Sequence, residues 1–182
     1  MGHIKTKDMK RVSRLIYIYN CYGGTHSSAL AAAYHLKKLP FSRKPTRNEI
    51  LSTDCFNQLS PKEMGKLIFH GLDEEGNQVY TIGRGSSKAV IPAMRGVLEL
   101  FEKNGKLQEK VIFSNTSPTV PIAMTFGGLF SRRLKIDPIG VPLLVLGAQQ
   151  AYQDIIKLVQ QTKNHAKTTS SMIEVLDNGF KG

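Results

Sequence analysis

A cysteine, two glycines and a run of polar side chains separate an apolar segment from an alanine-rich one. They read Cys21-Tyr22-Gly23-Gly24-Thr25-His26-Ser27-Ser28. Glycines let a backbone turn tightly and approach a ligand, and the first turn of a helix presents unpaired N–H groups at the positive end of its dipole. This combination is typical of an anion site, most often one for phosphate. We therefore predict that a phosphorylated small molecule or a nucleotide binds Gly23, Gly24, Thr25, Ser27 and Ser28.

Cys21 and His26 are the candidate catalytic residues of this 21–28 loop. A cysteine beside a helix N-terminus and a histidine is favoured as the thiolate, which is the nucleophilic form. His26 is a candidate donor to phosphate or a partner for Cys21. The alternatives are a small buried cysteine at a strand end and an exposed histidine at a helix start. Ser27 and Ser28 are expected to cap the helix in either case.

The hydrophobic pattern supplies the elements that must position this loop. We predict strands at residues 15–19, 66–70, 79–82, 110–113 and 141–146. We predict helices at residues 27–38, 89–103, 119–133 and 148–163, with a short helix after Thr46 and a helix start at Ser60. The strands at 66–70 and 79–82 form either a hairpin or part of a crossover. The alternation indicates an α/β fold, a three-layer sandwich with a mainly parallel sheet and a Gly-rich loop between its first strand and first helix.

Loops that leave the carboxyl ends of parallel strands share one edge of a sheet, where ligands bind. The predicted topology gathers the loops 20–28, 83–88, 114–118 and 146–148 at that edge. The further candidate ligand-binding residues are Arg84, Ser86, Asn115 and Thr116. Arg84 is the candidate guanidinium for an anion, whereas Arg132 and Arg133 are expected at a solvated helix end.

Length and composition bound the organisation of the chain. Its 182 residues are 41% hydrophobic, with a mean hydropathy of −0.21, as in globular proteins. We predict a flexible basic arm at 1–13, a single α/β domain at 14–165 and a polar C-terminal tail at 166–182. No apolar run approaches a membrane span and the first residues lack a signal-peptide core, so we expect a cytoplasmic protein without a membrane partner. The spacing of its two cysteines and five histidines predicts no metal site, and no cofactor is expected.

The charge balance is strongly basic. The 25 Lys and Arg residues against 14 Asp and Glu residues give a net charge of +11 at pH 7, which favours anionic partners. Nucleic acid is a second candidate partner, through the basic arm and residues 37–47. The proline-flanked segment 118–130 is a candidate contact with a second copy of the chain in a homodimer.

The 21–28 loop resembles two phosphate loops that follow a first strand and begin with cysteine. Cys21, Gly23 and Ser28 match the C-x-G-N-x-x-R-S loop of the low-molecular-weight tyrosine phosphatases, but Ser27 stands where that loop has arginine. The missing guanidinium is the group that would clamp a phosphate. Cys21, Gly24, Ser27 and Ser28 match the loop of the IIB components of sugar phosphotransferase systems, with His26 in place of a serine. A Walker A motif is excluded, because no Lys-Ser/Thr pair follows the glycines.

Over residues 15–163 the chain resembles a bacterial family of unknown function, found mainly in spore-forming Gram-positive bacteria. The resemblance lies in the segments YIYNCYGGTHSSALAAA, FSNTSP, GGLFSRRL and GVPLLVLGAQQAYQDIIKLV. It implies a shared fold and supplies no activity. Three functions stay open: binding of a phosphate-containing ligand, phosphoryl transfer through Cys21 by an enzyme or carrier, and a non-enzymatic regulatory or nucleic-acid-binding role.

Overall fold

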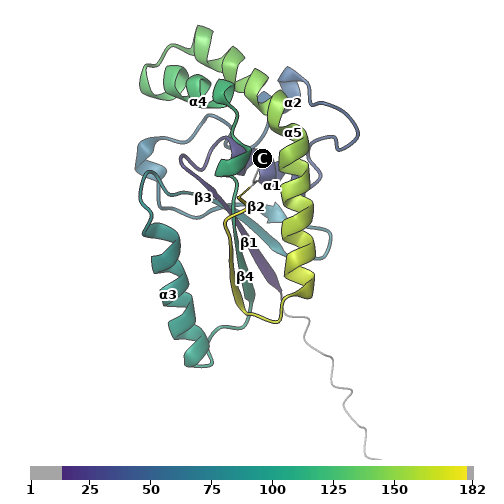
Figure 1. Ribbon diagram of the computed structural model, residues 1–182, viewed down its shortest axis with the longest axis vertical. Helices are drawn as coiled ribbons and strands as arrows, with labels where there is room; N and C mark the ends of the chain where they lie inside the picture. Colours follow the sequence, from purple (N-terminus) through teal and green to yellow (C-terminus); the bar gives the residue numbers. More distant parts are fainter. Residues whose placement is uncertain (1–13, 180–182) are drawn as a thin grey trace, which may run out of the picture.

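Residues 14–179 are described by the computed structural model, and they build a five-stranded sheet with helices packed on it (Figure 1). The strands are β1 (Leu15–Cys21), β2 (Ile68–Leu72), β3 (Gln78–Gly83), β4 (Lys110–Asn115) and β5 (Ile173–Leu176). Their order is β2-β3-β1-β4-β5, with β2 antiparallel to β3 and the other neighbours parallel. The predicted α/β class with a mainly parallel sheet is confirmed, and β2 and β3 form a hairpin.

Five α-helices accompany the strands. They are α1 (Ser27–His35), α2 (Arg47–Leu51), α3 (Val90–Lys103), α4 (Ile122–Gly128) and α5 (Asp137–Thr168). One turn of π-helix, Leu129–Arg133, follows α4, and 3-10 turns lie at Pro61–Glu63 and Ser117–Thr119. The short helix predicted after Thr46 is α2, and a capping box between Thr46 and Glu49 begins it. The helix start predicted at Ser60 yields only the first of the 3-10 turns.

The sheet buries apolar side chains on both of its faces. On β1, Tyr17 and Tyr19 belong to the apolar cluster that includes α1 and α5, whereas Ile18 belongs to a second cluster with Ile91 of α3. Side chains alternate between the faces of a strand, so neighbouring residues of β1 contact different helices. Figure 1 accordingly shows α3 and α5 on opposite sides of the sheet.

Residues 141–146, predicted as a strand, lie inside α5. Their apolar, partly β-branched run has the composition of a buried strand. Buried residues nevertheless recur every three or four positions from Gly140 to Ala166, with Leu144, Ala148 and Ala151 among them. The prediction was wrong because so short a window does not separate a buried strand from a buried helix, whereas the longer helical period does.

The last strand comes from the predicted polar tail. Residues 173–176 pair in parallel with β4, placing Ile173 opposite Val111 and Val175 opposite Phe113. The segment is short and flanked by polar residues, so its strand conformation depends on the free edge that β4 offers. The predicted basic arm, residues 1–13, lies outside the described residues.

Glycines bring α4 and α5 together as a helical hairpin. A Cβ on Gly127 would lie 2.6 Å from the amide nitrogen of Leu144, and one on Gly147 would lie 2.6 Å from the Cβ of Met124. No residue with a side chain fits these contacts without displacing the partner helix. The hairpin holds the π-helical turn above the carboxyl ends of the strands (Figure 1). None of the helices within residues 14–179 combines the length and apolarity that a bilayer crossing requires.

Candidate functional site

The side chain of Cys21 lies inside the 21–28 loop, at the end of β1. Its Sγ accepts a hydrogen bond from the backbone amide of Gly24 at 3.2 Å and lies 3.1 Å from Oγ of Ser28. The residue is only 5% exposed. The Gly24 amide, predicted to contact a ligand, is instead engaged by the protein's own sulfur.

Ser27 and Ser28 are the first residues of α1, and neither caps it. The N-cap position belongs to His26, which makes no side-chain capping bond. Oγ of Ser27 lies 2.9 Å from Oγ1 of Thr116, and that hydroxyl donates to the carbonyl oxygen of Asn20. Because Thr116 has a single proton, Ser27 must donate to it. The capping prediction was wrong because the Ser27 hydroxyl is hydrogen-bonded to Thr116 after β4 and the Ser28 hydroxyl lies against Sγ of Cys21.

The loops at 20–28 and 83–88 pack directly against each other, and glycines allow their backbones to approach closely. A Cβ on Gly24, whose φ is +69°, would lie 2.5 Å from the amide nitrogen of Gly83. The amide of Arg84 donates to the carbonyl of Cys21 at 3.0 Å, and the amide of Gly85 donates to the carbonyl of Tyr22 at 2.8 Å. This close approach requires glycine at position 24, because a side chain would be strained in this conformation and would meet the β3 backbone.

The loop after β4 joins the same cluster through Arg84. Nη2 of Arg84 donates to Oγ of Ser117 at 3.0 Å, and Oδ1 of Asn115 accepts from the amide of Ser117. Ser86 is exposed. Residues 146–148 do not form a fourth loop, because they lie within α5 and Gly147 packs against Met124.

His26 is oriented by a residue that the sequence did not single out. Its Nε2 lies 3.2 Å from Oδ1 of Asn57, and its ring contacts Phe56 edge-on, with centroids 5.5 Å apart. Burial lowers the pKa of His26 from 6.5 to about 4; the hydrogen bond to Asn57 opposes this shift and the charge of Arg132 adds to it. The imidazole is therefore neutral at pH 7 and is not a cationic donor for phosphate.

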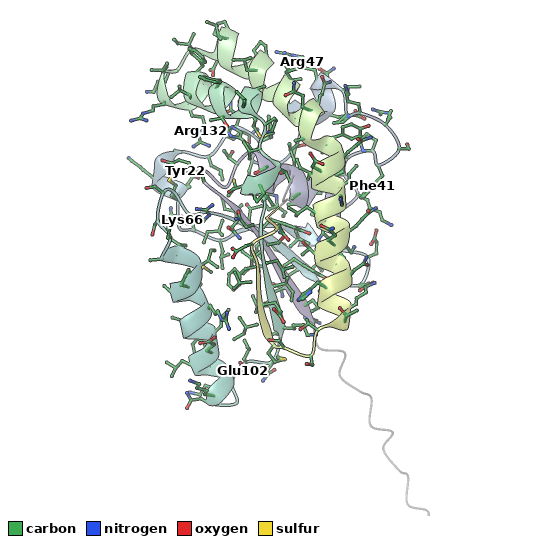
Figure 2. The ribbon with its side chains drawn as sticks, viewed as in Figure 1. Tyr22, Phe41, Arg47, Lys66, Glu102 and Arg132 are labelled. Carbon is green, nitrogen blue, oxygen red and sulfur yellow. The ribbon has the colours of Figure 1, made fainter. Side chains whose placement is uncertain are left out.

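Arg132 faces the 21–28 loop and is not at a solvated helix end. Its Nη1 is buried and has no hydrogen-bond partner among the described residues. The same atom lies 3.8 Å from the position that a Cβ on Gly23 would take. Burial lowers the pKa of Arg132, and the nearby Cys21 and Glu63 oppose that shift. Figure 2 shows Arg132 beneath the α4–α5 hairpin, on the side of the molecule that carries Tyr22.

The expectation of a solvated Arg132 failed for a structural reason. The residue lies in a π-helical turn, which rotates its side chain away from the direction that a regular α-helix gives. Arg133, the next residue, is exposed as expected. A position so far along the chain from Cys21 carries no local signal of the contact, which depends on how the hairpin packs.

Residues 53–57 hold the 21–28 loop from outside. Oγ1 of Thr25 donates to the carbonyl of Cys55, and the amide of Asn57 donates to the carbonyl of Thr25 at 3.2 Å. Cys55 and Asn57 have φ values of +62° and +56°. Left-handed conformations in residues other than glycine cost about 1 kcal/mol and persist where surrounding contacts enforce them.

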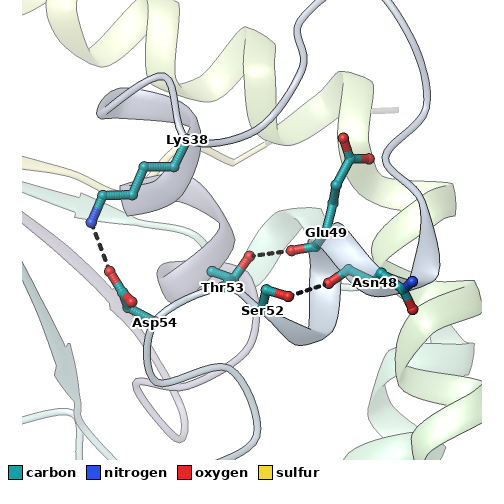
Figure 3. Close-up of a pocket in the computed structure, with 6 residues that line it drawn as sticks. All are labelled: Lys38, Asn48, Glu49, Ser52, Thr53 and Asp54. Carbon is teal, nitrogen blue, oxygen red and sulfur yellow. Dashed lines mark hydrogen bonds and ion pairs between the residues drawn. The ribbon is translucent and has the colours of Figure 1, made fainter.

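A hollow elsewhere on the surface has no part in this cluster. It encloses about 290 Å³ between α2 and the segment that follows it (Figure 3). Its lining residues are Lys38, Asn48, Glu49, Ser52, Thr53 and Asp54. The Lys38–Asp54 ion pair, at 2.6 Å, crosses its edge, and none of the predicted site residues lines it.

The other predicted partner surfaces are partly occupied. Within the basic segment 37–47, Lys37 pairs with Glu74, Lys38 with Asp54 and Arg43 with Glu49. These pairs reduce the positive charge available to nucleic acid, and that partner stays a prediction. On α4, Ile122 is 76% exposed, so the predicted contact with a second copy lies at the surface and also stays a prediction. No group of His, Cys, Asp and Glu residues suited to a metal occurs within residues 14–179.

Comparison with known proteins gives one match. The model of a family described as "Protein of unknown function (DUF3189)" matches residues 16–164. No curated protein and no solved structure matches the chain.

Proposed function

This chain belongs to the DUF3189 family of unknown function, and from its site we propose that the 21–28 loop binds a phosphate-containing ligand. One observation carries the proposal: Nη1 of Arg132 is buried beside the loop without a hydrogen-bond partner among the described residues. A buried polar group without a partner is unfavourable, and more so a charged one. An oxyanion next to Gly23 would supply the missing acceptor and neutralise the guanidinium.

The start of α1 supports the same ligand. The helix begins at Ser27 and has no acidic residue in its first turn, so no carboxylate of its own neutralises the dipole there. The first amides of a helix have no partner within the helix. Together with Arg132 they offer both parts of an anion site, a set of N–H groups and a fixed cation. We therefore propose Arg132 as the guanidinium that binds the anion, the role for which the sequence analysis named Arg84.

Binding of inorganic phosphate to the full chain tests the proposal. Titration calorimetry should give saturable binding, and phosphate should raise the melting temperature. Arg132→Met should weaken binding at least ten-fold, because it removes a charged hydrogen-bond donor and keeps an unbranched apolar stem. Arg133→Met is the matched control, since its neighbouring side chain is exposed and should leave binding unchanged. Absence of binding at millimolar phosphate, or equal loss in both variants, would contradict the proposal.

A second candidate function is phosphoryl transfer through Cys21, favoured by the Gly24 amide and the Ser28 hydroxyl at its Sγ. The thiolate would attack the phosphorus of a phosphate monoester, forming an S–P bond while the P–O bond to the leaving group breaks and the leaving alkoxide takes a proton from water. Water or an acceptor hydroxyl would then take the phosphoryl group and restore the thiolate.

Cys21→Ser should abolish a phosphocysteine detectable by mass spectrometry, and Cys55→Ser should not. A phosphoprotein that survives Cys21→Ser would reject the mechanism.

A further inference from the structure

A chain of hydrogen bonds runs from the start of α5 to His26. Oγ of Ser131 donates to Oδ1 of Asp137, and Nδ2 of Asn57 donates to Oγ of Ser131 at 2.8 Å. Oδ1 of Asn57 then faces Nε2 of His26 at 3.2 Å. The chain joins three segments that are distant in sequence and ends on a ring of the 21–28 loop.

The direction of this chain is fixed by proton counting. The hydroxyl of Ser131 has one proton, which goes to Asp137, so it can only accept from Asn57. Asn57 must therefore turn its amide nitrogen to Ser131 and its carbonyl oxygen to His26. A carbonyl oxygen only accepts, so Nε2 of His26 carries the proton. In the neutral ring Nδ1 then has a lone pair and no proton.

The Nδ1 side of the ring faces a residue without a side chain. A Cβ on Gly128 would lie 3.2 Å from Cε1 and 3.5 Å from Nδ1 of His26. Glycine at this position keeps that edge of the imidazole uncrowded. The charge of Arg132 also acts on His26, so the two side chains are near enough to interact electrostatically.

We propose that the site selects an oxyanion that carries a proton, as phosphate does and sulfate does not, with Nδ1 of His26 accepting that proton's hydrogen bond. This inference rests on the proposed function and narrows its ligand class to inorganic phosphate and other oxyanions that keep an O–H group at the pH of binding. Asn57, Ser131 and Asp137 are positioning residues, because they act on the ligand only by fixing the tautomer of His26.

The selection has a simple physical basis. Phosphate and sulfate are tetrahedral and similar in size, so Arg132 and the amides of α1 attract both. At neutral pH inorganic phosphate retains at least one O–H group, whereas sulfate presents only acceptors. The lone pair of Nδ1 forms a hydrogen bond with the first and repels the second. An acceptor that faces another acceptor loses affinity by the cost of an unmade hydrogen bond.

The inference is tested by titrating the full chain with phosphate and with sulfate at equal ionic strength. We expect phosphate to bind about ten-fold more tightly or better, the effect of one hydrogen bond to a charged group. Asn57→Gly removes the amide yet suits the left-handed backbone at this position, and it should bring the two affinities together. Gln58→Ala, its exposed neighbour, should preserve the difference.

Imidazole ¹⁵N chemical shifts give a readout that needs no ligand. They should show a protonated Nε2 and an unprotonated Nδ1 for His26 in the wild type, and a mixture of tautomers in Asn57→Gly. Equal affinity for both anions, or a proton on Nδ1, would overturn the inference while leaving the proposed function standing. Binding of neither anion would overturn the proposed function and this inference together.

Discussion

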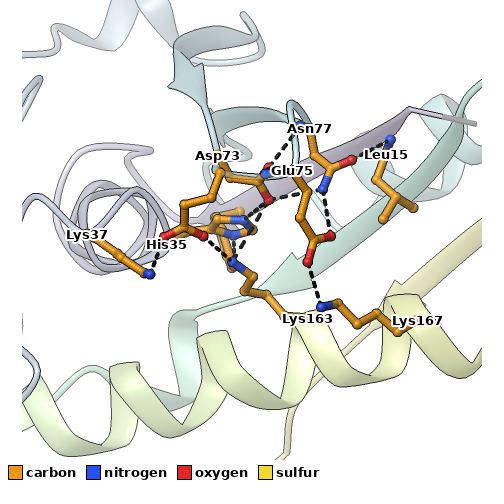
Figure 4. Close-up of polar contacts among 10 residues, drawn as sticks. Leu15, His35, Lys37, Asp73, Glu75, Asn77, Lys163 and Lys167 are labelled. Carbon is orange, nitrogen blue, oxygen red and sulfur yellow. Dashed lines mark hydrogen bonds and ion pairs between the residues drawn. The ribbon is translucent and has the colours of Figure 1, made fainter. Parts of the chain in front are cut away.

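A half-buried histidine before α1 and a buried histidine at its end show how differently the same side chain can be used. His26 precedes the helix and His35 ends it, and burial lowers the pKa of each to about 4. His35 is enclosed on both sides: Nδ1 meets the hydroxyl of Tyr19 at 2.8 Å, and Nε2 meets Oδ2 of Asp73 at 3.0 Å (Figure 4). His26 has a fixed partner at Nε2 only.

The surroundings of Asp73 extend the contrast. This carboxylate also accepts from Asn77 and from the amide of Glu75, and Lys163 lies 3.9 Å away. The His35 cluster therefore satisfies its charge within the protein, whereas the loop beside Arg132 does not. A depressed histidine pKa occurs in both places and so does not distinguish a site from a core. A buried cation without a partner does.

The largest expected effect comes from breaking the closed cluster. Asp73→Ala leaves the donors of His35 and Asn77 buried without acceptors and should lower the free energy of unfolding by about 3 kcal/mol or more. Urea denaturation measures this loss. Asp54→Ala removes an exposed partner of Lys38 and should cost less than about 1 kcal/mol. At urea concentrations at which it is still folded, Asp73→Ala should bind phosphate as the wild type does. Loss of binding in the folded variant would contradict a purely structural role for the His35 cluster.

The next effect has the opposite sign. Arg132→Met removes a half-buried guanidinium whose buried Nη1 lacks a partner and keeps much of its apolar stem, so the free energy of unfolding should stay unchanged or rise by about 1 kcal/mol. The same variant should lose phosphate binding. Gain of stability with loss of binding is the signature of a group kept for a ligand. A clear loss of stability in urea denaturation would instead place Arg132 with Asp73 as a structural residue.

Acid should destabilise the protein through both histidines. Their folded pKa values, about 4, lie below the ordinary 6.5, so the unfolded chain binds protons that the folded protein excludes. The contribution of each histidine to the free energy of unfolding should be fully present above about pH 6.5. It should fall as the pH drops towards 4, by up to about 1.4 kcal/mol per pH unit for each histidine. His26→Phe, which keeps a ring against Phe56, should remove the contribution of His26 from that slope in denaturation curves measured across this range, whereas His35 and His70, whose pKa burial also lowers, should keep theirs. An unchanged slope would show that His26 titrates normally.

The sequence predicts the 21–28 loop and the elements beside it far better than the side chains that reach this loop from other parts of the chain. Residues 15–19 and the alanines after Ser28 carry local signals, so β1, α1 and the loop between them follow from pattern alone. The position of Cys21 at the strand end follows as well. Arg132 and Asn57 reach the loop through a π-helical turn and two left-handed residues, and neither is encoded in nearby residues.

The wrong sequence-based predictions also arise from contacts that form only in the folded chain. Ser27 and Ser28 are residue types that often cap helices, but Thr116 after β4 engages the hydroxyl of Ser27, and Sγ of Cys21 engages that of Ser28. Residues 173–176 form a strand because β4 offers them an edge. Sequence pattern predicts what a segment favours alone, whereas each missed feature depends on a partner that only the folded chain supplies.

The smallest effect concerns the strain that holds the loop. Cys55 contributes its backbone carbonyl to Thr25, and its φ of +62° favours glycine. Cys55→Gly keeps the carbonyl and relieves the left-handed strain, so it should raise the free energy of unfolding by about 0.5–1 kcal/mol. Ser52→Gly is the control: with a φ of −83° it has no such strain and should lose stability instead. If Cys55→Gly is stabilised and binds phosphate as before, the left-handed turn serves only to carry the carbonyl; weaker binding would mean that the strained backbone itself sets the geometry of the 21–28 loop.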